Sequence, residues 1–148
     1  MLRVFVTTLN KLEEIKMPTV MESLDQQFVN SIGAVLDLAV MERLLEDTSV
    51  EFLPSLIEVF ETESAQRLDN INANLASADM SSLSVEAHSL KGTSATFGAE
   101  ALRSLSEKIE KSAKAGDTAA VAVLVPELPE KLTAVLSALQ QFASKLEA

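Results

Sequence analysis

The sequence predicts an all-α protein, an up-down-up-down four-helix bundle with short additional N-terminal helices. The first observation behind this prediction is composition: aromatic residues make up 4% of the chain, cysteine is absent, and glycine and proline occur four times each. Such a mixture favours helices over strands. The second is that apolar residues recur at steps of three and four along four long segments joined by short links. Short links of this kind predict antiparallel neighbours in a bundle.

Residues 1–34 are expected to form a helical extension that docks on the bundle. Apolar residues at helical spacing predict a first short helix, which ends before a Met-Pro pair; they are Leu2, Phe5, Leu9 and Leu12. A capping box of Thr19 and Glu22 predicts the opening of a second short helix, which ends near Gly33.

Residues 35–148 are expected to form the bundle. A short helix capped by Asp37 is predicted before the four apolar stripes, which run over residues 53–75, 83–97, 102–113 and 128–146. Thr48 and Glu51 resemble a capping box for the first stripe, but Pro54 leaves open a start near residue 53 after a separate turn.

The ends of the later helices also have local signals. The second stripe is expected to start after Asp79, and the third to start after Gly98 and stop at Gly116. A further short helix over residues 117–125 is predicted to precede the fourth stripe. Pro126 and Pro129 would then fall in or near the first turn of that last helix, where proline is tolerated.

Charge and hydropathy exclude several classes of partner. A net charge of −10 leaves no basic patch to displace counterions from DNA or RNA, or to bind an anionic membrane surface. No apolar run approaches the ~20 residues that a membrane span needs. Charged residues follow the first apolar residues too soon for a secretory signal. We therefore expect a cytoplasmic protein, a monomer by default, with no nucleic acid and no membrane as partner.

The single histidine, His88, is the strongest candidate for chemistry. At ~100° per residue it lies about 140° from the centre of its helix's apolar stripe, among small and charged residues, so we expect an exposed imidazole. Such a ring is a good nucleophile near neutral pH. Gly92, one turn along, leaves room for the in-line approach that phosphoryl transfer needs, although glycine there costs about 1 kcal/mol relative to alanine. Lys91 offers a mobile positive charge for phosphoryl oxygens.

The run from His88 to Gly98, His-Ser-Leu-Lys-Gly-Thr-Ser-Ala-Thr-Phe-Gly, closely resembles the motif of the histidine-containing phosphotransfer (HPt) family of multistep phosphorelays. Phe97 stands where the family usually has an aliphatic residue. The resemblance extends from about residue 35 to the C-terminus. It implies a four-helix bundle on which His88 accepts a phosphoryl group from an aspartyl phosphate on a receiver domain and passes it to another receiver.

The resemblance also implies supporting residues on the next helix. Several relatives carry Glu or Gln at the position of Glu110, bonded to the other ring nitrogen of the histidine. Such a bond fixes the tautomer and leaves one nitrogen to attack. Glu110 flanks the apolar stripe of its helix and is placed to face His88, with an ordinary solvated glutamate as the alternative. Lys114 matches a position where some relatives carry a basic residue.

The implied partners are the receiver domains of a hybrid sensor histidine kinase and of a response regulator. Receivers are expected to dock on the patch around the histidine, together with the helix over residues 53–75 and Lys114; the patch comprises Ser81, Ser84, Val85 and Ala95. No cofactor is expected on this chain, and Mg²⁺ is expected on the partner receiver domain.

Other functions fit the sequence less well. One histidine and no Glu-x-x-His pair argue against a di-metal bundle or a zinc site. Nothing resembles a nucleotide-binding domain, so autokinase activity is not expected. The chain would then be a stoichiometric phosphocarrier, and whether to class it as an enzyme stays open. The alternative function is a helical-bundle adaptor that binds a receiver or kinase without being phosphorylated.

Overall fold

The computed structural model describes residues 24–147, and the helix expected near residues 2–12 lies outside them. Within the described part all regular secondary structure is helical, which confirms the predicted fold class. In chain order its α-helices are α3 Gln26–Gly33, α4 Leu38–Asp47, α5 Leu53–Ala76, α6 Met80–Thr96, α7 Glu100–Lys114, α8 Thr118–Leu124 and α9 Leu128–Glu147. Two single 3₁₀ turns, Val50–Phe52 and Val125–Glu127, lead into α5 and α9.

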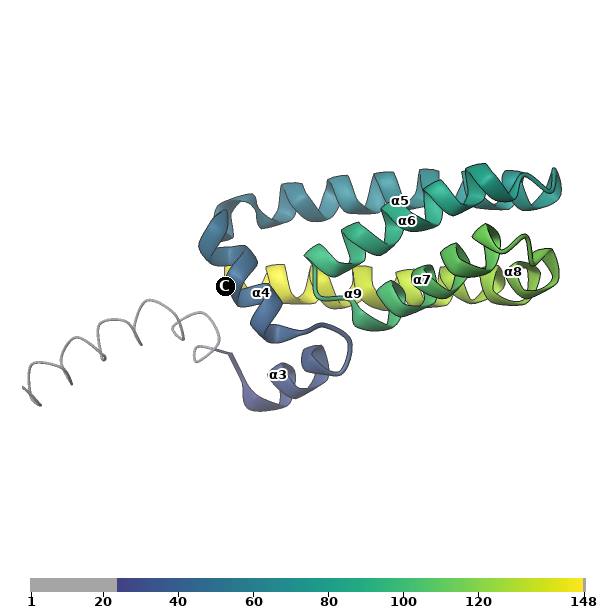
Figure 1. The fold of residues 1–148 in the computed structure, drawn as a ribbon. Helices are drawn as coiled ribbons and strands as arrows, with labels where there is room; N and C mark the ends of the chain where they lie inside the picture. The colour runs from purple at the N-terminus through teal and green to yellow at the C-terminus, as the bar shows by residue number, and fades with distance from the viewer. Residues whose placement is uncertain (1–23, 148) are drawn as a thin grey trace, which may run out of the picture.

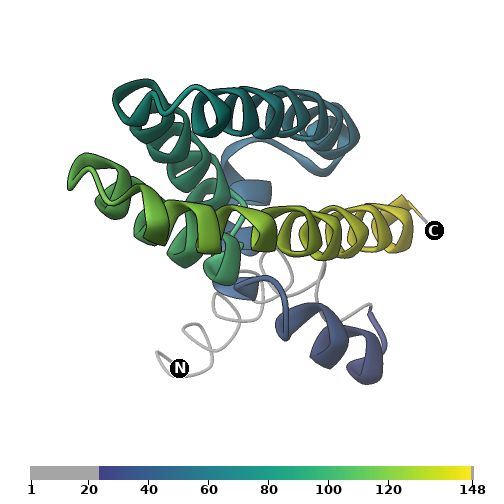
Figure 2. The same cartoon turned by 90° about the vertical axis from the view of Figure 1, so that its right-hand side faces the viewer.

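The four long helices α5, α6, α7 and α9 form the bundle and alternate in direction (Figure 1). Helix α6 packs against α5 on one side and α7 on the other, while α9 returns along both α5 and α7. Figure 2 shows α9 crossing the face of the molecule with α8 leading into it. Helix α6, which carries His88, therefore lies between α5 and α7, and these two helices supply the surroundings of the histidine.

Three aspartates begin helices as N-caps. The carboxylate of Asp37 accepts hydrogen bonds from the backbone amides of the second and third residues that follow it. Asp79 and Asp117 each accept one from the third residue that follows. These bonds satisfy amides that have no partner inside the helix. The predicted starts of α4 and α6 are thus confirmed, and the short helix expected over residues 117–125 is present as α8.

The predicted capping box of Thr48 and Glu51 does not start the first long helix. The Thr48 hydroxyl instead donates to the Leu44 carbonyl at 2.6 Å, at the end of α4. Helix α5 begins only after the 3₁₀ turn, with Pro54 in its first turn, which is the alternative that the proline left open. The box of Thr19 and Glu22 lies outside the described residues, and residues 24 and 25 are not helical, so the helix that ends at Gly33 starts at Gln26.

The core is one apolar cluster that runs the length of the bundle and includes residues from each α-helix of the described part. Its largest fully buried side chains are Phe60, Phe142, Ile32, Leu36, Met41, Leu53, Ile71, Leu83, Leu90, Leu102, Ile109 and Leu128. Phe97, the departure from the usual aliphatic residue, stacks on Phe60 with ring centroids 4.8 Å apart. The larger ring is therefore accommodated by an aromatic partner on α5.

The segment before the bundle is tied to it at one point of close backbone contact. The Asp37 amide donates to the Gly98 carbonyl at 2.7 Å. Gly98 has a φ of +68°, and a Cβ there would lie 2.9 Å from the Asp37 carbonyl oxygen. Ile32 and Leu36 are buried in the same core as the bundle helices. The predicted division of the chain after residue 34 stays a prediction.

No helix within residues 24–147 has the combination of length and apolar character that crossing a membrane requires.

Candidate functional site

His88 stands on the outer surface of α6, and its side chain is 65% exposed. The exposure predicted from the helical wheel is therefore confirmed. The predicted apolar stripe is buried throughout; it consists of Leu83, Ala87, Leu90 and Ser94 of the same helix and Phe97, the residue that follows it. Helix α6 thus buries one face in the core and presents the imidazole on the other.

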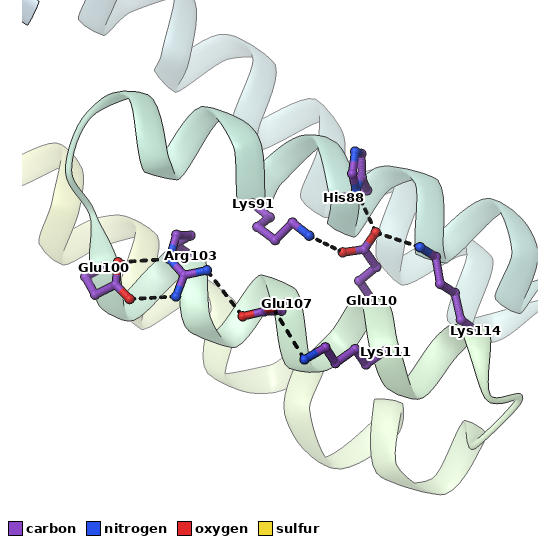
Figure 3. Close-up of polar contacts among 8 residues, drawn as sticks. All are labelled: His88, Lys91, Glu100, Arg103, Glu107, Glu110, Lys111 and Lys114. Carbon is purple, nitrogen blue, oxygen red and sulfur yellow. Dashed lines mark hydrogen bonds and ion pairs between the residues drawn. The ribbon is translucent and has the colours of Figure 1, made fainter.

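The imidazole is held from the next helix by Glu110. His88 Nδ1 lies 2.6 Å from Glu110 Oε2, and the glutamate side chain is only 4% exposed (Figure 3). An ionised carboxylate only accepts hydrogen bonds, so Nδ1 carries the proton and donates. The neutral ring then has its lone pair on Nε2. The predicted facing of Glu110 and His88 is confirmed, and the alternative of a solvated glutamate is wrong.

Two lysines complete the surroundings of the carboxylate. Lys91 Nζ lies 2.7 Å from Glu110 Oε1, and Lys114 Nζ lies 3.1 Å from Oε2 (Figure 3). The hydrogen bond from Lys91, followed by those from Lys114 and His88, lowers the pKa of Glu110 from 4.5 to about 2, although burial opposes the shift. The carboxylate is therefore ionised at any physiological pH and remains an acceptor for the ring.

Gly92 keeps the surface beside the imidazole free of side-chain atoms. A Cβ built on this glycine meets no atom within 4 Å, so nothing inside the protein requires glycine at this position. Its φ is not in the left-handed region, unlike those of Gly98 and Gly116. The space in front of Gly92 opens outward, next to the exposed ring.

The rest of the predicted docking patch is exposed except for one residue. Ser81 and Ala95 are exposed, and Val85 is 62% exposed, which is unusual for a large apolar side chain. Ser84 is the correction: it is buried, and its hydroxyl donates to the Ser81 carbonyl at 2.7 Å. Ser84 lies seven residues, or two turns, before Lys91, so both occupy the flank of α6 that packs on α7.

Further ion pairs near the site were not predicted. On α7, Arg103 bonds both Glu100 and Glu107, and Lys111 lies 3.4 Å from Glu107 (Figure 3). The three- and four-residue spacing of these charges is a sequence signal that predicts such pairs. On the other side of α6, Arg67 of α5 bonds Glu86 at 3.1 Å, and no local spacing predicts that contact.

The described residues include no cluster of three or more histidine, aspartate or glutamate side chains that could hold a metal ion. His88 is thus a single nucleophilic ring, fixed at one nitrogen by a carboxylate and bordered by two ammonium groups.

The family model described as Hpt domain matches residues 55–142, more than half of the chain. The chain belongs to the Hpt domain family. Its structure is similar to the crystal structure of histidine-containing phosphotransfer protein B (HptB) from Pseudomonas aeruginosa PAO1, with a TM-score of 0.69 and 29% identity. The similarity covers 74% of this chain and 94% of that chain. No curated protein sequence matches the chain.

Family membership supports histidine phosphotransfer in two-component signalling as the function of this Hpt protein. Proteins of the family interact with receiver domains of kinases and response regulators in phosphorelays. The matched residues begin near the start of α5 and end within α9, so they include His88 and each side chain that binds Glu110.

Proposed function

We propose that this Hpt protein carries phosphoryl groups from one receiver domain to another, with His88 as the phosphoacceptor. The observation that carries the proposal is the bond between His88 Nδ1 and the ionised Glu110, which leaves the lone pair on Nε2 of an exposed ring. A hybrid sensor kinase would supply the first receiver, and a response regulator would supply the second.

In the transfer step, His88 Nε2 attacks the phosphorus of an aspartyl phosphate. The N–P bond forms as the P–O bond to the aspartyl oxygen breaks, and the electron pair of that bond leaves with the receiver's carboxylate. The ring gains positive charge as it attacks. Its Nδ1 proton stays on the bond to Glu110, and the carboxylate offsets that charge. The reverse sequence at a second receiver returns the phosphoryl group to an aspartate.

Neighbouring residues take supporting roles in this proposal. Lys91 holds Glu110 ionised, and since it binds the same carboxylate as the ring, its ammonium would turn to the phosphoryl oxygens. Gly92 leaves the approach to Nε2 open to the partner. Lys114 shares the oxygen of Glu110 that the ring binds, so it borders the same approach.

The receiver would dock on exposed, uncharged residues of α6, among them Ser81, Val85 and Ala95, together with the adjoining helix α5 and Lys114. Ser84 lies beneath this patch and supports it without touching the partner. The metal ion that assists aspartyl phosphate chemistry would come with the receiver domain. The Hpt protein then acts as a stoichiometric carrier, and a monomer is sufficient because one chain holds the whole arrangement.

The test is transfer from a phosphorylated receiver domain carrying radiolabel. The wild type should become labelled, His88→Gln should not, and a second receiver should take the label from the wild type. Equal labelling of both forms would refute the role of His88. Binding of the receiver without labelling of the wild type would instead favour the adaptor.

A further inference from the structure

We propose that the N-terminal segment, residues 2–12, docks on the outer face of α9, in two grooves that flank this helix. Helices α6 and α9 each pack against both α5 and α7, so they lie diagonally across the bundle from each other. The outer face of α9 therefore points away from the face of α6 that carries His88. The proposal concerns a separate surface and holds whether or not the protein carries phosphoryl groups.

The outer face of α9 lacks charged residues over about three turns. Between residues 132 and 144 each exposed side chain is uncharged, and these residues are Thr133, Ala134, Ser137, Gln140, Gln141 and Ser144. In the whole chain 23% of the residues are charged. The face of a helix that meets water usually has charged residues, and the centre of a protein interface is depleted of them. The outer face of α9 thus resembles a surface that another segment covers.

Two grooves border this face of α9. The first, of about 370 Å³, lies between α3 and α9, and Phe28 is the apolar residue of its lining. The second, of about 270 Å³, lies between α5 and α9, and its apolar residues include Ile57. Gln140 and Ser144 line both grooves, which therefore lie side by side across α9. In Figure 1, α9 accordingly lies between α5 and α3.

The amphipathic pattern and the length of residues 2–12 fit this site. These residues lie outside the described part, and their apolar stripe of Leu2, Phe5, Leu9 and Leu12 predicts a helix. A helix of this length is marginal in water unless its apolar face packs against protein. Eleven helical residues are about 16 Å long, and the uncharged stretch of α9, residues 133–144, is about 18 Å long. The grooves on either side of that stretch would receive the apolar side chains.

The chain can reach the site without strain. Leu24, the first described residue, packs against the core and lies four residues before Phe28. Four residues span at most about 14 Å, so the described chain begins close to the first groove. Phe28 is held there by Lys145, whose Nζ lies 5.6 Å from the ring centroid. Residues 13–23 span up to about 40 Å when extended, which is more than twice the length of the uncharged stretch.

Charge favours this occupant over a second copy of the chain. Residues 2–12 contain Arg3 and Lys11 and no acidic residue. Glu58 and Glu61 line the groove between α5 and α9, and both are exposed. The N-terminal segment therefore meets opposite charge at that rim, which helps to fix its orientation. A second copy docked through the same face would instead bring its own two glutamates to the interface.

The experiment measures disulfide formation between introduced cysteines, since the natural chain has none. In the test pair, made in the full chain, Thr8→Cys is combined with Ser137→Cys. Thr8 is near the middle of the N-terminal segment and beside its apolar stripe, and Ser137 is near the middle of the uncharged stretch, so the pair is close for either direction of the segment. The control pair combines Thr8→Cys with Ala95→Cys, which is exposed on α6.

The rate of disulfide formation is followed in oxidised glutathione on non-reducing gels, and circular dichroism checks each fold. The test pair should form a disulfide within one chain at least about tenfold faster than the control pair, because docking raises the effective concentration of the two thiols. Leu9→Asp, within the apolar stripe, should slow the test pair by about tenfold. Asn10→Asp adds the same charge on the opposite face of the predicted helix and should leave the rate within about twofold.

A second comparison tests the acidic rim. At about 50 mM salt, Glu61→Lys should slow the test pair by about threefold, and the effect should shrink at about 300 mM salt. Glu63→Lys is the matched control, because Glu63 is exposed on the same helix but lies about 160° around it from Glu61. It should leave the rate within about twofold, and equal slowing by the two reversals would overturn the role of the rim.

Three results would overturn the docking site itself. Equal rates for the test and control pairs would show that the N-terminal segment does not lie on α9. A faster control pair would place it over the face that carries His88. Disulfides formed mainly between two chains would make a second copy the occupant of the grooves.

Discussion

Replacement of Gly92 by alanine should stabilise the protein and impair its phosphotransfer at the same time. Gly92 lies inside α6, four residues before its end, with a backbone conformation that alanine adopts without strain. An added Cβ meets no atom within 4 Å, so the isolated protein loses nothing by the change. Alanine is favoured over glycine in a helix interior by about 1 kcal/mol.

The magnitude follows from these observations. Unfolding of Gly92→Ala should cost about 1 kcal/mol more than unfolding of the wild type, which corresponds to a rise in Tm of about 2–4 °C for a domain of this size. The same methyl group would stand beside the ring in the path of the receiver. Because small displacements at a reacting centre are costly, we expect transfer from a phosphorylated receiver to slow by at least about tenfold.

The assay pairs urea unfolding followed by circular dichroism with single-turnover transfer from a labelled receiver. A matched control is Asn72→Ala, since Asn72 is exposed in the interior of α5 and asparagine also has a lower helix propensity than alanine. That control should gain stability and transfer at the wild-type rate. A Gly92→Ala protein less stable than the wild type would show that alanine is strained at this position, and transfer at the wild-type rate would show that the methyl group does not obstruct the receiver.

Two further predictions concern the other glycines and the buried carboxylate. Gly98→Ala should destabilise the protein by about 2–3 kcal/mol, because the φ of Gly98 is positive and the added Cβ would lie 2.9 Å from the Asp37 carbonyl oxygen. Gly116→Ala should cost only about 1 kcal/mol, because Gly116 has a positive φ but open space around it. Denaturant unfolding measures both losses, and equal losses would contradict the role of the Asp37 contact. The pKa of Glu110 is lowered to about 2, so its contribution to stability is complete above pH 4.5 and is lost as pH falls through 2. As the pH falls from 5 to 2, the free energy of unfolding of Glu110→Gln should therefore decrease less than that of the wild type. If the two free energies fall in parallel, the neighbours of Glu110 do not lower its pKa.

Local signals in the sequence predicted most of the helices. The caps at Asp37 and Asp79 are contacts within three residues, and the apolar stripes follow from a fixed periodicity, so both can be found without knowledge of the fold. The capping box of Thr48 and Glu51 and the position of Pro54 predicted different starts for α5, and the sequence alone could not decide between them. The proline was the better guide because its ring fits only the first turn of a helix.

The site was predicted in part, and the missing contacts are those between helices. The periodicity placed His88 outside the core and Glu110 at the edge of its stripe, but not the depth of burial of that carboxylate. Lys91 was expected to be a mobile cation and is instead bonded across to α7, because α6 and α7 pack closely along that flank. Ser84 was expected at the surface because a helical wheel contains no neighbouring helix, and it is buried because α7 packs on that flank of α6.

The proposed transfer requires that Glu110 hold Nδ1 of His88 and leave Nε2 to accept the phosphoryl group. The most direct measurement is a long-range ¹H–¹⁵N spectrum of the ¹⁵N-labelled protein before and after transfer, which a single histidine keeps free of overlap. We expect a proton on Nδ1 in the free protein and phosphorus on Nε2 in the charged protein. Phosphorus on Nδ1, or a free ring with its proton on Nε2, would contradict it.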